Sequence, residues 1–193
     1  MTFDRGRWSL RALVAGVIAL AAPAQTAWAG VDVGQPAPPL VVEEFDGGQT
    51  FDLSALQGHV VILNFWATWC PPCRQEMPTL DAFYRLHHPE GLEMIGLSVG
   101  SDRSRDRADV RDAMQGIAYP AAMLKDATRD GFGTPSALPL TVVIDTRGRI
   151  AAKLTSDEGR LTQQHLADVV LPLLAAEVAT PIQGGSGDSA AAP

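Results

Sequence analysis

Two cysteines separated by two prolines are the residues best suited to chemistry in this chain of 193 residues. Cys70 and Cys73 are its only cysteines, and they stand where an apolar segment gives way to a helical pattern. The positive end of a helix dipole favours the thiolate of a cysteine in the first turn. A second thiol one turn later can attack a mixed disulfide formed by the first. The spacing therefore predicts a redox dithiol, with Cys70 as the exposed nucleophile and Cys73 as the sheltered resolving thiol.

Pro71 and Pro72 bear on the strength of this effect. Proline suits the first helical turn, but it has no amide N–H to donate to the Cys70 thiolate. The N–H of Cys73 is the main donor that remains. We therefore expect a thiolate that is stabilised only moderately, which favours a reductant over a strong oxidant.

A structural disulfide or half of a metal site is the other use of such a pair. A four-thiolate zinc site is excluded because the chain has no further cysteines. The imidazoles are not spaced to complete a site with the two sulfurs; they belong to His59, His87, His88 and His165. The sequence predicts neither a metal nor a cofactor.

The segments around the cysteines predict a mixed α/β domain. Residues 60–66 and 92–99 are apolar runs typical of buried strands, and residues 71–86 between them show helical periodicity. This order predicts parallel strands joined by a crossover helix, in a central mixed sheet with helices on both faces. The other predicted elements are an N-terminal hairpin (40–45 and 49–53), a helix (103–114), a short strand (118–124), a second hairpin (140–145 and 150–154) and a last helix capped by Thr162 and kinked or split at Pro172.

The two ends of the chain differ from the middle. Residues 1–29 have the basic start, apolar stretch and small-residue site of an export signal, with an uncleaved membrane anchor as the alternative. Residues 179–193 are mostly Gly, Ser and Ala and predict a disordered tail. Residues 33–178 form the predicted domain. A formal charge of −7 argues against nucleic acid as a partner, and a hydrophobic content of 46% excludes wholesale disorder.

The segment VVILNFWATWCPPCRQEMPTL resembles the active-site region of the thioredoxin superfamily, in particular of the exported TlpA/ResA-like (CcmG/DsbE-like) thiol-disulfide oxidoreductases. The opening GQPAP and the LTVVIDTRGRI that follows Leu138-Pro139 resemble the same family. The resemblance implies a thioredoxin-like fold. It implies catalytic roles for Cys70, Cys73 and Glu76, and substrate contacts from Trp69, Pro71, Pro72, Leu138 and Pro139, the last in a cis-proline loop.

Three further positions carry specific expectations. Asn64 stands where ordinary thioredoxin has a buried aspartate, as in TlpA/ResA-like members. Glu76, one turn beyond Cys73, is placed to exchange a proton with the thiols; the alternative is a solvated carboxylate on the helix surface. Trp66 either walls the site together with Trp69 or packs in the core.

The resulting hypothesis is a periplasmic thiol-disulfide oxidoreductase, soluble or held at the membrane by an uncleaved leader. It reduces disulfides of client proteins, with apocytochrome c as an extrapolation from the family, and an upstream membrane donor of thiol electrons re-reduces it. The alternatives are a disulfide-forming oxidase, a thiol peroxidase and a copper chaperone of the Sco type. The peroxidatic Thr-x-x-Cys spacing is missing, since Thr68 lies two residues before Cys70, and Sco-type chaperones space their cysteines CxxxC.

Overall fold

The computed structural model describes residues 31–178, except 46 and 101–105. The predicted export signal, the predicted tail and the first residues of the helix predicted from 103 therefore lie outside the described residues. Within the described part, no helix is long and apolar enough to span a bilayer.

A mixed sheet stands at the centre of the described region, with strand order β5-β4-β3-β7-β8. Its strands are β3 (Val60–Trp66), β4 (Leu92–Ser98), β5 (Ala121–Met123), β7 (Leu140–Ile144) and β8 (Ile150–Thr155). β3 runs parallel to β4 and antiparallel to β7, so the predicted mixed sheet is confirmed. Every residue of β3 is buried, which explains its unbroken apolar sequence.

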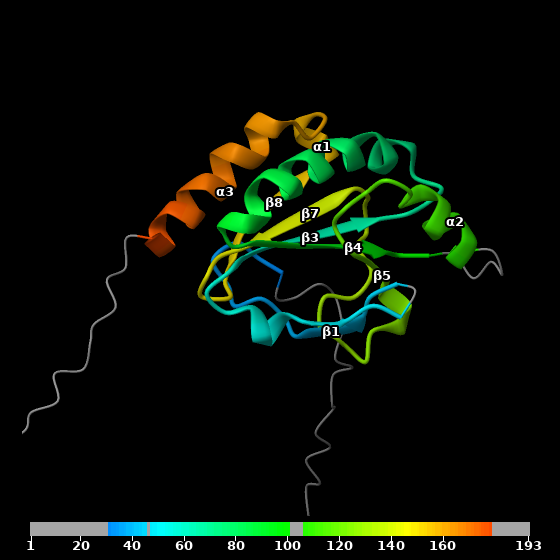
Figure 1. Cartoon of the computed structure of the whole chain (residues 1–193), viewed down its shortest axis with the longest axis horizontal. Coiled ribbons are helices and arrows are strands. Elements are labelled where there is room, and N and C mark those ends of the chain that lie inside the picture. The colour runs from blue at the N-terminus through cyan, green and yellow to red at the C-terminus, as the bar shows by residue number, and fades with distance from the viewer. Residues whose placement is uncertain (1–30, 46, 101–105, 179–193) are drawn as a thin grey trace, which may run out of the picture.

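The α-helices of the described region gather on one side of this sheet; the other face, where the sequence also predicts helices, carries a smaller sheet and two short 3₁₀ helices. α1 (Pro71–His87) and α3 (Gln163–Val178) lie over the first face of the central sheet, as Figure 1 shows. Val60 and Ile62 of β3 pack against α1 and α3 in one apolar cluster. α2 (Asp106–Ala113) packs through Val110 into a separate cluster that holds the cysteines. The helix side thus contains both a core and the redox pair.

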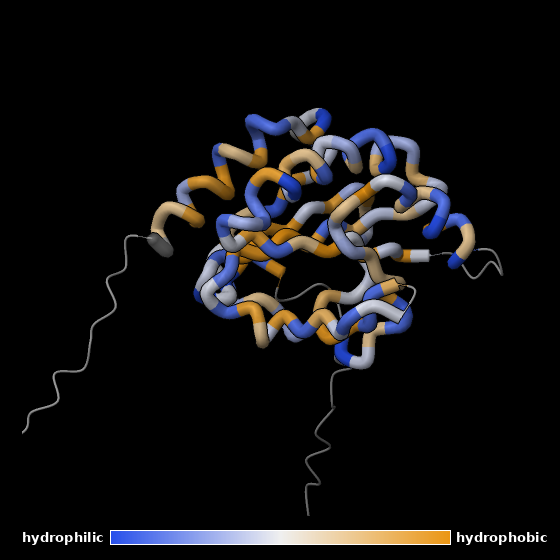
Figure 2. Tube along the Cα trace, in the orientation of Figure 1, coloured by the Kyte–Doolittle hydropathy of each residue, from blue (hydrophilic) through white to orange (hydrophobic). Residues whose placement is uncertain are grey.

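A smaller sheet covers the opposite face, with strand order β2-β1-β6. β1 (Leu40–Glu43) and β2 (Thr50–Asp52) form the predicted N-terminal hairpin. The short helices η1 (Leu53–Leu56) and η3 (Leu124–Asp126) contribute Leu53 and Leu124 to the apolar cluster between the two sheets. β6 (Arg129–Asp130) was not predicted, because two exposed polar residues show no apolar alternation. Figure 2 shows apolar residues concentrated along the central sheet. The predicted thioredoxin-like fold is confirmed.

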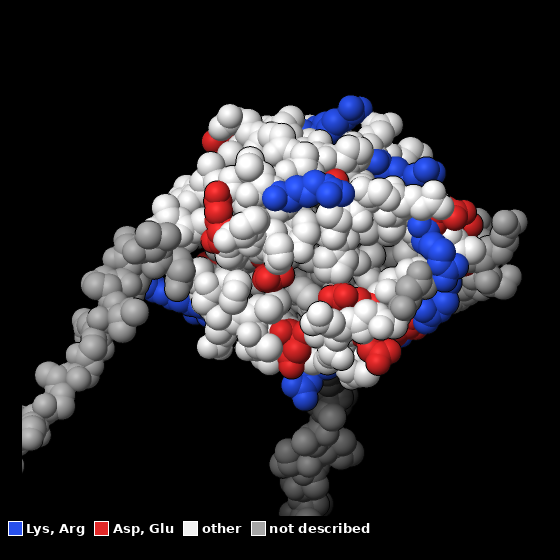
Figure 3. All heavy atoms as spheres, viewed as in Figure 1, with Lys and Arg blue, Asp and Glu red and all other residues white. Residues whose placement is uncertain are grey.

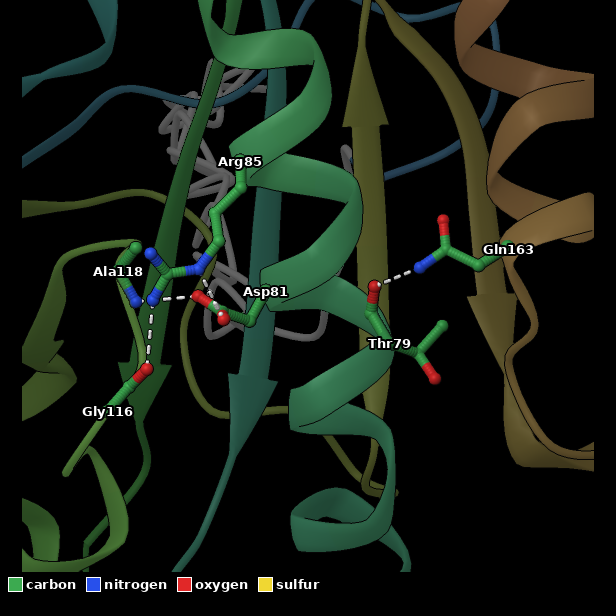
Figure 4. A network of polar contacts seen from close by, with 6 residues as sticks. All are labelled: Thr79, Asp81, Arg85, Gly116, Ala118 and Gln163. Carbon is green, nitrogen blue, oxygen red and sulfur yellow. Dashed lines mark hydrogen bonds and ion pairs between the residues drawn. The ribbon is translucent and has the colours of Figure 1, made fainter.

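α3 is tied to its surroundings at its start. The Thr162 hydroxyl accepts a hydrogen bond from the backbone N–H of His165 at 3.1 Å, which confirms the predicted cap. Gln163 donates from its side chain to the Thr79 carbonyl of α1 at 2.6 Å (Figure 4). The helix runs through Pro172 without a break, so the prediction of a split is wrong. Pro172 is exposed, and there a carbonyl that loses its helical partner can bond to water.

The middle of α1 is tied to the loop that follows α2. Asp81 accepts hydrogen bonds from the Ala118 N–H at 2.6 Å and from Nε of Arg85 at 2.8 Å (Figure 4). Arg85 in turn donates to the Gly116 carbonyl at 2.9 Å. α1, which begins at the cysteines, is therefore anchored on both flanks.

The burial of α1 yields a test with a control on the same helix. Leu80 is fully buried against the sheet, whereas Leu86 is 64% exposed. We expect Leu80→Ala to lower the free energy of unfolding by about 2–5 kcal/mol, because it removes apolar contacts and leaves a cavity. Leu86→Ala should change it by no more than about 0.5 kcal/mol. Denaturant unfolding of the disulfide-bonded protein measures both; equal losses would contradict this packing.

Candidate active site

Cys70 is the residue that caps α1. β3 ends at Trp66, and the chain turns into the helix with the Cys70 N–H donating to the Ala67 carbonyl at 3.1 Å. Cys70 and Cys73 form a disulfide. The Cys73 N–H points at the Cys70 sulfur with 3.3 Å between nitrogen and sulfur. The sequence-based expectation that this amide remains as the donor to the first sulfur is confirmed.

Both cysteines are buried in the disulfide form. Cys70 is 4% exposed and Cys73 2%, so the prediction of an exposed Cys70 is wrong for this state. The reason is that the bonded sulfurs share an apolar cluster with Trp66, Ala67 and Met77. Trp66 is fully buried in that cluster, which favours its interpretation as core packing beneath the pair.

Trp69 is the exposed aromatic residue beside the disulfide, 56% exposed. Together with Arg74 of α1 and with Asp109 and Asp112 of α2 it lines a groove of about 390 Å³, which we call the Trp69 groove. Pro71 is exposed next to it. The face seen in Figure 3 carries charges of both signs scattered among uncharged atoms. The lining of the Trp69 groove itself combines an aromatic side chain with charges of both signs.

The Leu138–Pro139 peptide bond is cis, as the resemblance implies. It immediately precedes β7, whose Leu140 pairs with Phe65 of β3. Leu138 is partly buried against the cluster that contains both cysteines, and Pro139 is buried. The topology thus brings this loop to the end of the sheet where the disulfide lies. The substrate contacts of Leu138 and Pro139 remain a prediction.

Glu76 is buried although it carries a carboxylate, with 4% of its surface exposed. Its Oε1 accepts a hydrogen bond from the Leu161 N–H at 3.2 Å. Burial raises the pKa of Glu76, while the Leu161 hydrogen bond and the positive charge of Arg160 act in the opposite direction. The alternative of a solvated carboxylate on the helix surface is wrong.

A hollow of about 220 Å³ adjoins Glu76 between α1, β8 and α3; we call it the Glu76 hollow. Thr141 of β7 lines it, and its hydroxyl accepts a hydrogen bond from the Asn64 side chain at 3.0 Å. Asn64 and Thr141 are both neutral, so neither places a second charge beside the carboxylate. A buried acid next to an open hollow is suited to proton exchange.

The sequence did not point to Arg160, Leu161 or Thr141. Leu161 acts through its backbone N–H, which every residue except proline has, and it contacts Glu76 across 85 positions of sequence. No local pattern could have found it. Among the described residues, no three His, Cys, Asp or Glu side chains are grouped so that they could hold a metal ion.

Comparisons with known proteins agree with this geometry. Residues 33–153 match the AhpC/TSA family. The thiol-disulfide oxidoreductase ResA of Geobacillus thermodenitrificans is 30% identical over 144 residues, which are 72% of this chain and 79% of that protein. A thioredoxin-family thiol:disulfide interchange protein from Chlorobium tepidum has a similar structure, with a TM-score of 0.60 and 28% identity over 72% of this chain and 95% of that one. A secreted thiol-disulfide isomerase from Corynebacterium glutamicum gives a TM-score of 0.58 and 27% identity, over 73% and 86%.

The raised pKa of Glu76 predicts a pH-dependent cost to folding. At pH values above 4.5, the ordinary pKa of this carboxyl group, it ionises more readily in the unfolded chain than in the folded protein. Its ionisation therefore lowers the free energy of unfolding as the pH rises. Glu76→Gln keeps an acceptor for Leu161 but does not titrate. We expect the variant to gain stability relative to the wild type as the pH rises from about 4.5 towards 7.

Denaturant unfolding of both proteins across that pH range measures the difference. Glu43→Gln, at an exposed position of β1, controls for the loss of one carboxylate and should show a smaller change with pH. A Glu76→Gln curve parallel to the wild type would show that burial does not disfavour the charged form.

Proposed function

The chain belongs to the AhpC/TSA family and is a thiol-disulfide oxidoreductase, and on that premise we propose that it acts as a reductant of disulfides in client proteins. The observation that carries the proposal is the cap of α1, where the Cys73 N–H faces the Cys70 sulfur and Pro71 and Pro72 supply no donor. Fewer donors stabilise the thiolate less, and a less stabilised dithiol is a weaker oxidant.

In the proposed reaction, the Cys70 thiolate attacks one sulfur of a client disulfide. A bond forms between Cys70 and the client, and the client's other sulfur leaves as a thiolate. Cys73 then loses its proton and attacks the Cys70 sulfur, which forms the Cys70–Cys73 disulfide and frees the second client sulfur. The two electrons pass to the client.

Glu76 is the proposed acceptor of the Cys73 proton. It lies one helical turn beyond Cys73 on α1 and is buried on the same side of the helix as that residue. A carboxyl group whose pKa is raised by burial is better matched to a thiol than an exposed carboxyl group would be. Asn64 is neutral and donates to Thr141, so it cannot itself take this proton.

The proposed client surface surrounds the disulfide. Trp69 and Pro71 are exposed beside it, and the cis Leu138–Pro139 bond lies at the same end of the sheet. An extended client segment between these two loops would present its disulfide to Cys70 and could pair with the backbone at Leu138. Pro72, also exposed, completes the rim.

The proposed place of action is the periplasm, and the proposed donor is a membrane protein. The export pattern of residues 1–29 supports this, as does the similarity to a secreted thiol-disulfide isomerase. Each cycle leaves the protein as a disulfide, so two electrons must arrive from outside an oxidising compartment. Apocytochrome c, whose CxxCH cysteines must be reduced before haem attachment, is the proposed client in cytochrome c maturation.

The reduction potential tests the direction of the reaction. We expect a value nearer to about −270 mV than to about −120 mV, measured by equilibration with defined thiol–disulfide buffers. A reduction potential near about −120 mV would make the protein an oxidant. Pro72→Ala adds an N–H at the second position of α1, and this N–H can donate to the capping sulfur of Cys70. The variant should therefore have a less negative reduction potential. Pro71→Ala adds an N–H at the first position, which does not serve the cap, and is the matched control.

Single-cysteine variants test the order of attack. Cys73→Ser should accumulate mixed disulfides between Cys70 and clients when it is expressed in its native host, because the resolving thiol is lost. Cys70→Ser should accumulate none. Non-reducing electrophoresis followed by mass spectrometry identifies the adducts. Equal trapping by the two variants, or none by Cys73→Ser, would contradict the assignment of Cys70 as the nucleophile.

A further inference from the structure

A short segment after η4 (Ser156–Glu158) reaches back to the active-site helix. It turns at Gly159, whose φ of 101° is readily adopted only by glycine. The next residue, Arg160, donates from its side chain to Gln75 Oε1 at 2.7 Å. Leu161 donates from its backbone to Glu76 Oε1 at 3.2 Å. Two successive residues of this segment therefore bind two successive residues of α1.

We propose that Arg160 is a positioning residue for Glu76: its cation and the Leu161 amide together stabilise the charged form of the buried carboxylate, so that it can accept a proton from Cys73. Gln75 fixes the guanidinium in place because it offers a neutral acceptor one residue away from Glu76. The inference rests on the proton exchange proposed above for Glu76.

The titratable groups that line the Glu76 hollow do not supply a permanent positive charge. α3 contributes His165 and Asp168 to the Glu76 hollow, both on exposed positions. Asp168 is acidic and opposes a second negative charge, and His165 carries a positive charge only when it is protonated. From β7 and β8 come uncharged side chains, those of Thr141, Leu154 and Thr155. Arginine stays protonated throughout the pH range in which a glutamate titrates.

The electrostatics of Glu76 are consistent with this division of roles. Burial raises its pKa, and the Leu161 hydrogen bond and the Arg160 charge are what lower it. Without Arg160, the carboxyl group would stay protonated to a higher pH. A protonated Glu76 cannot accept the proton that Cys73 must lose before it attacks.

The experiment follows the Glu76 carboxyl carbon by NMR in the disulfide-bonded full chain, with Glu76→Gln to assign its signal. We expect Arg160→Gln to move the titration midpoint of Glu76 to higher pH by several tenths of a unit or more. Arg160→Lys should recover at least half of this shift, because it restores the charge. Arg147→Gln removes the same charge from the exposed turn between β7 and β8 and should leave the midpoint unchanged.

Two outcomes would overturn the inference: a midpoint in Arg160→Gln that equals that of Arg147→Gln, or a shift in Arg160→Gln that His165→Gln reproduces in full. A second measurement separates this inference from the proposed function. The rate of Cys73 alkylation in the reduced protein, followed against pH, should shift with Glu76. If the Glu76 midpoint moves in Arg160→Gln and the alkylation profile does not, Arg160 positions Glu76 but the proposed proton exchange with Cys73 is wrong.

Discussion

The hydrogen bond from the Cys73 N–H to the Cys70 sulfur is the interaction on which the site depends. It makes a sulfur the cap of α1, in the place where most helices use an oxygen. The same bond orients Cys70, supplies a donor to its sulfur and places Cys73 one helical turn away. The prolines between the two cysteines keep the number of donors low. The hydrogen bond that caps α1 is therefore also the one that affects the redox properties of Cys70.

The elements around the first turn of α1 fix its position in the fold. β3 is buried along its whole length and ends directly before the turn, so its position is fixed by both layers of the core. α1 is tied through Asp81 to the loop after α2 and through Thr79 to the start of α3. These hydrogen bonds join α1 to its neighbours on both flanks. The β7 strand adds the cis-proline loop from the other side.

The sequence predicts those parts whose cause is local. The apolar run of β3, the helical periodicity after Pro71, and Thr162 as a cap are written in neighbouring residues, and the structure confirms them. Other parts arise from contacts between distant segments. β6 exists because it pairs with β1, and the burial of Glu76 depends on a backbone N–H that is 85 positions away. The exposure of Cys70 was predicted wrongly for a related reason: a helix cap is exposed by default, and only the disulfide and its cluster bury it.

The burial of both sulfurs has a consequence for how the oxidised protein behaves among small molecules. Exchange requires a thiolate to approach a disulfide sulfur along the line of the bond, and its rate depends on access. Free thiols of low molecular weight, such as glutathione, meet an almost closed surface here. Burial of both cysteines therefore slows the attack of a small thiol on the oxidised protein, although equilibration still occurs given time. A macromolecule that docks beside the pair holds its own sulfur close to it, so docking favours exchange with such a partner over exchange with small thiols.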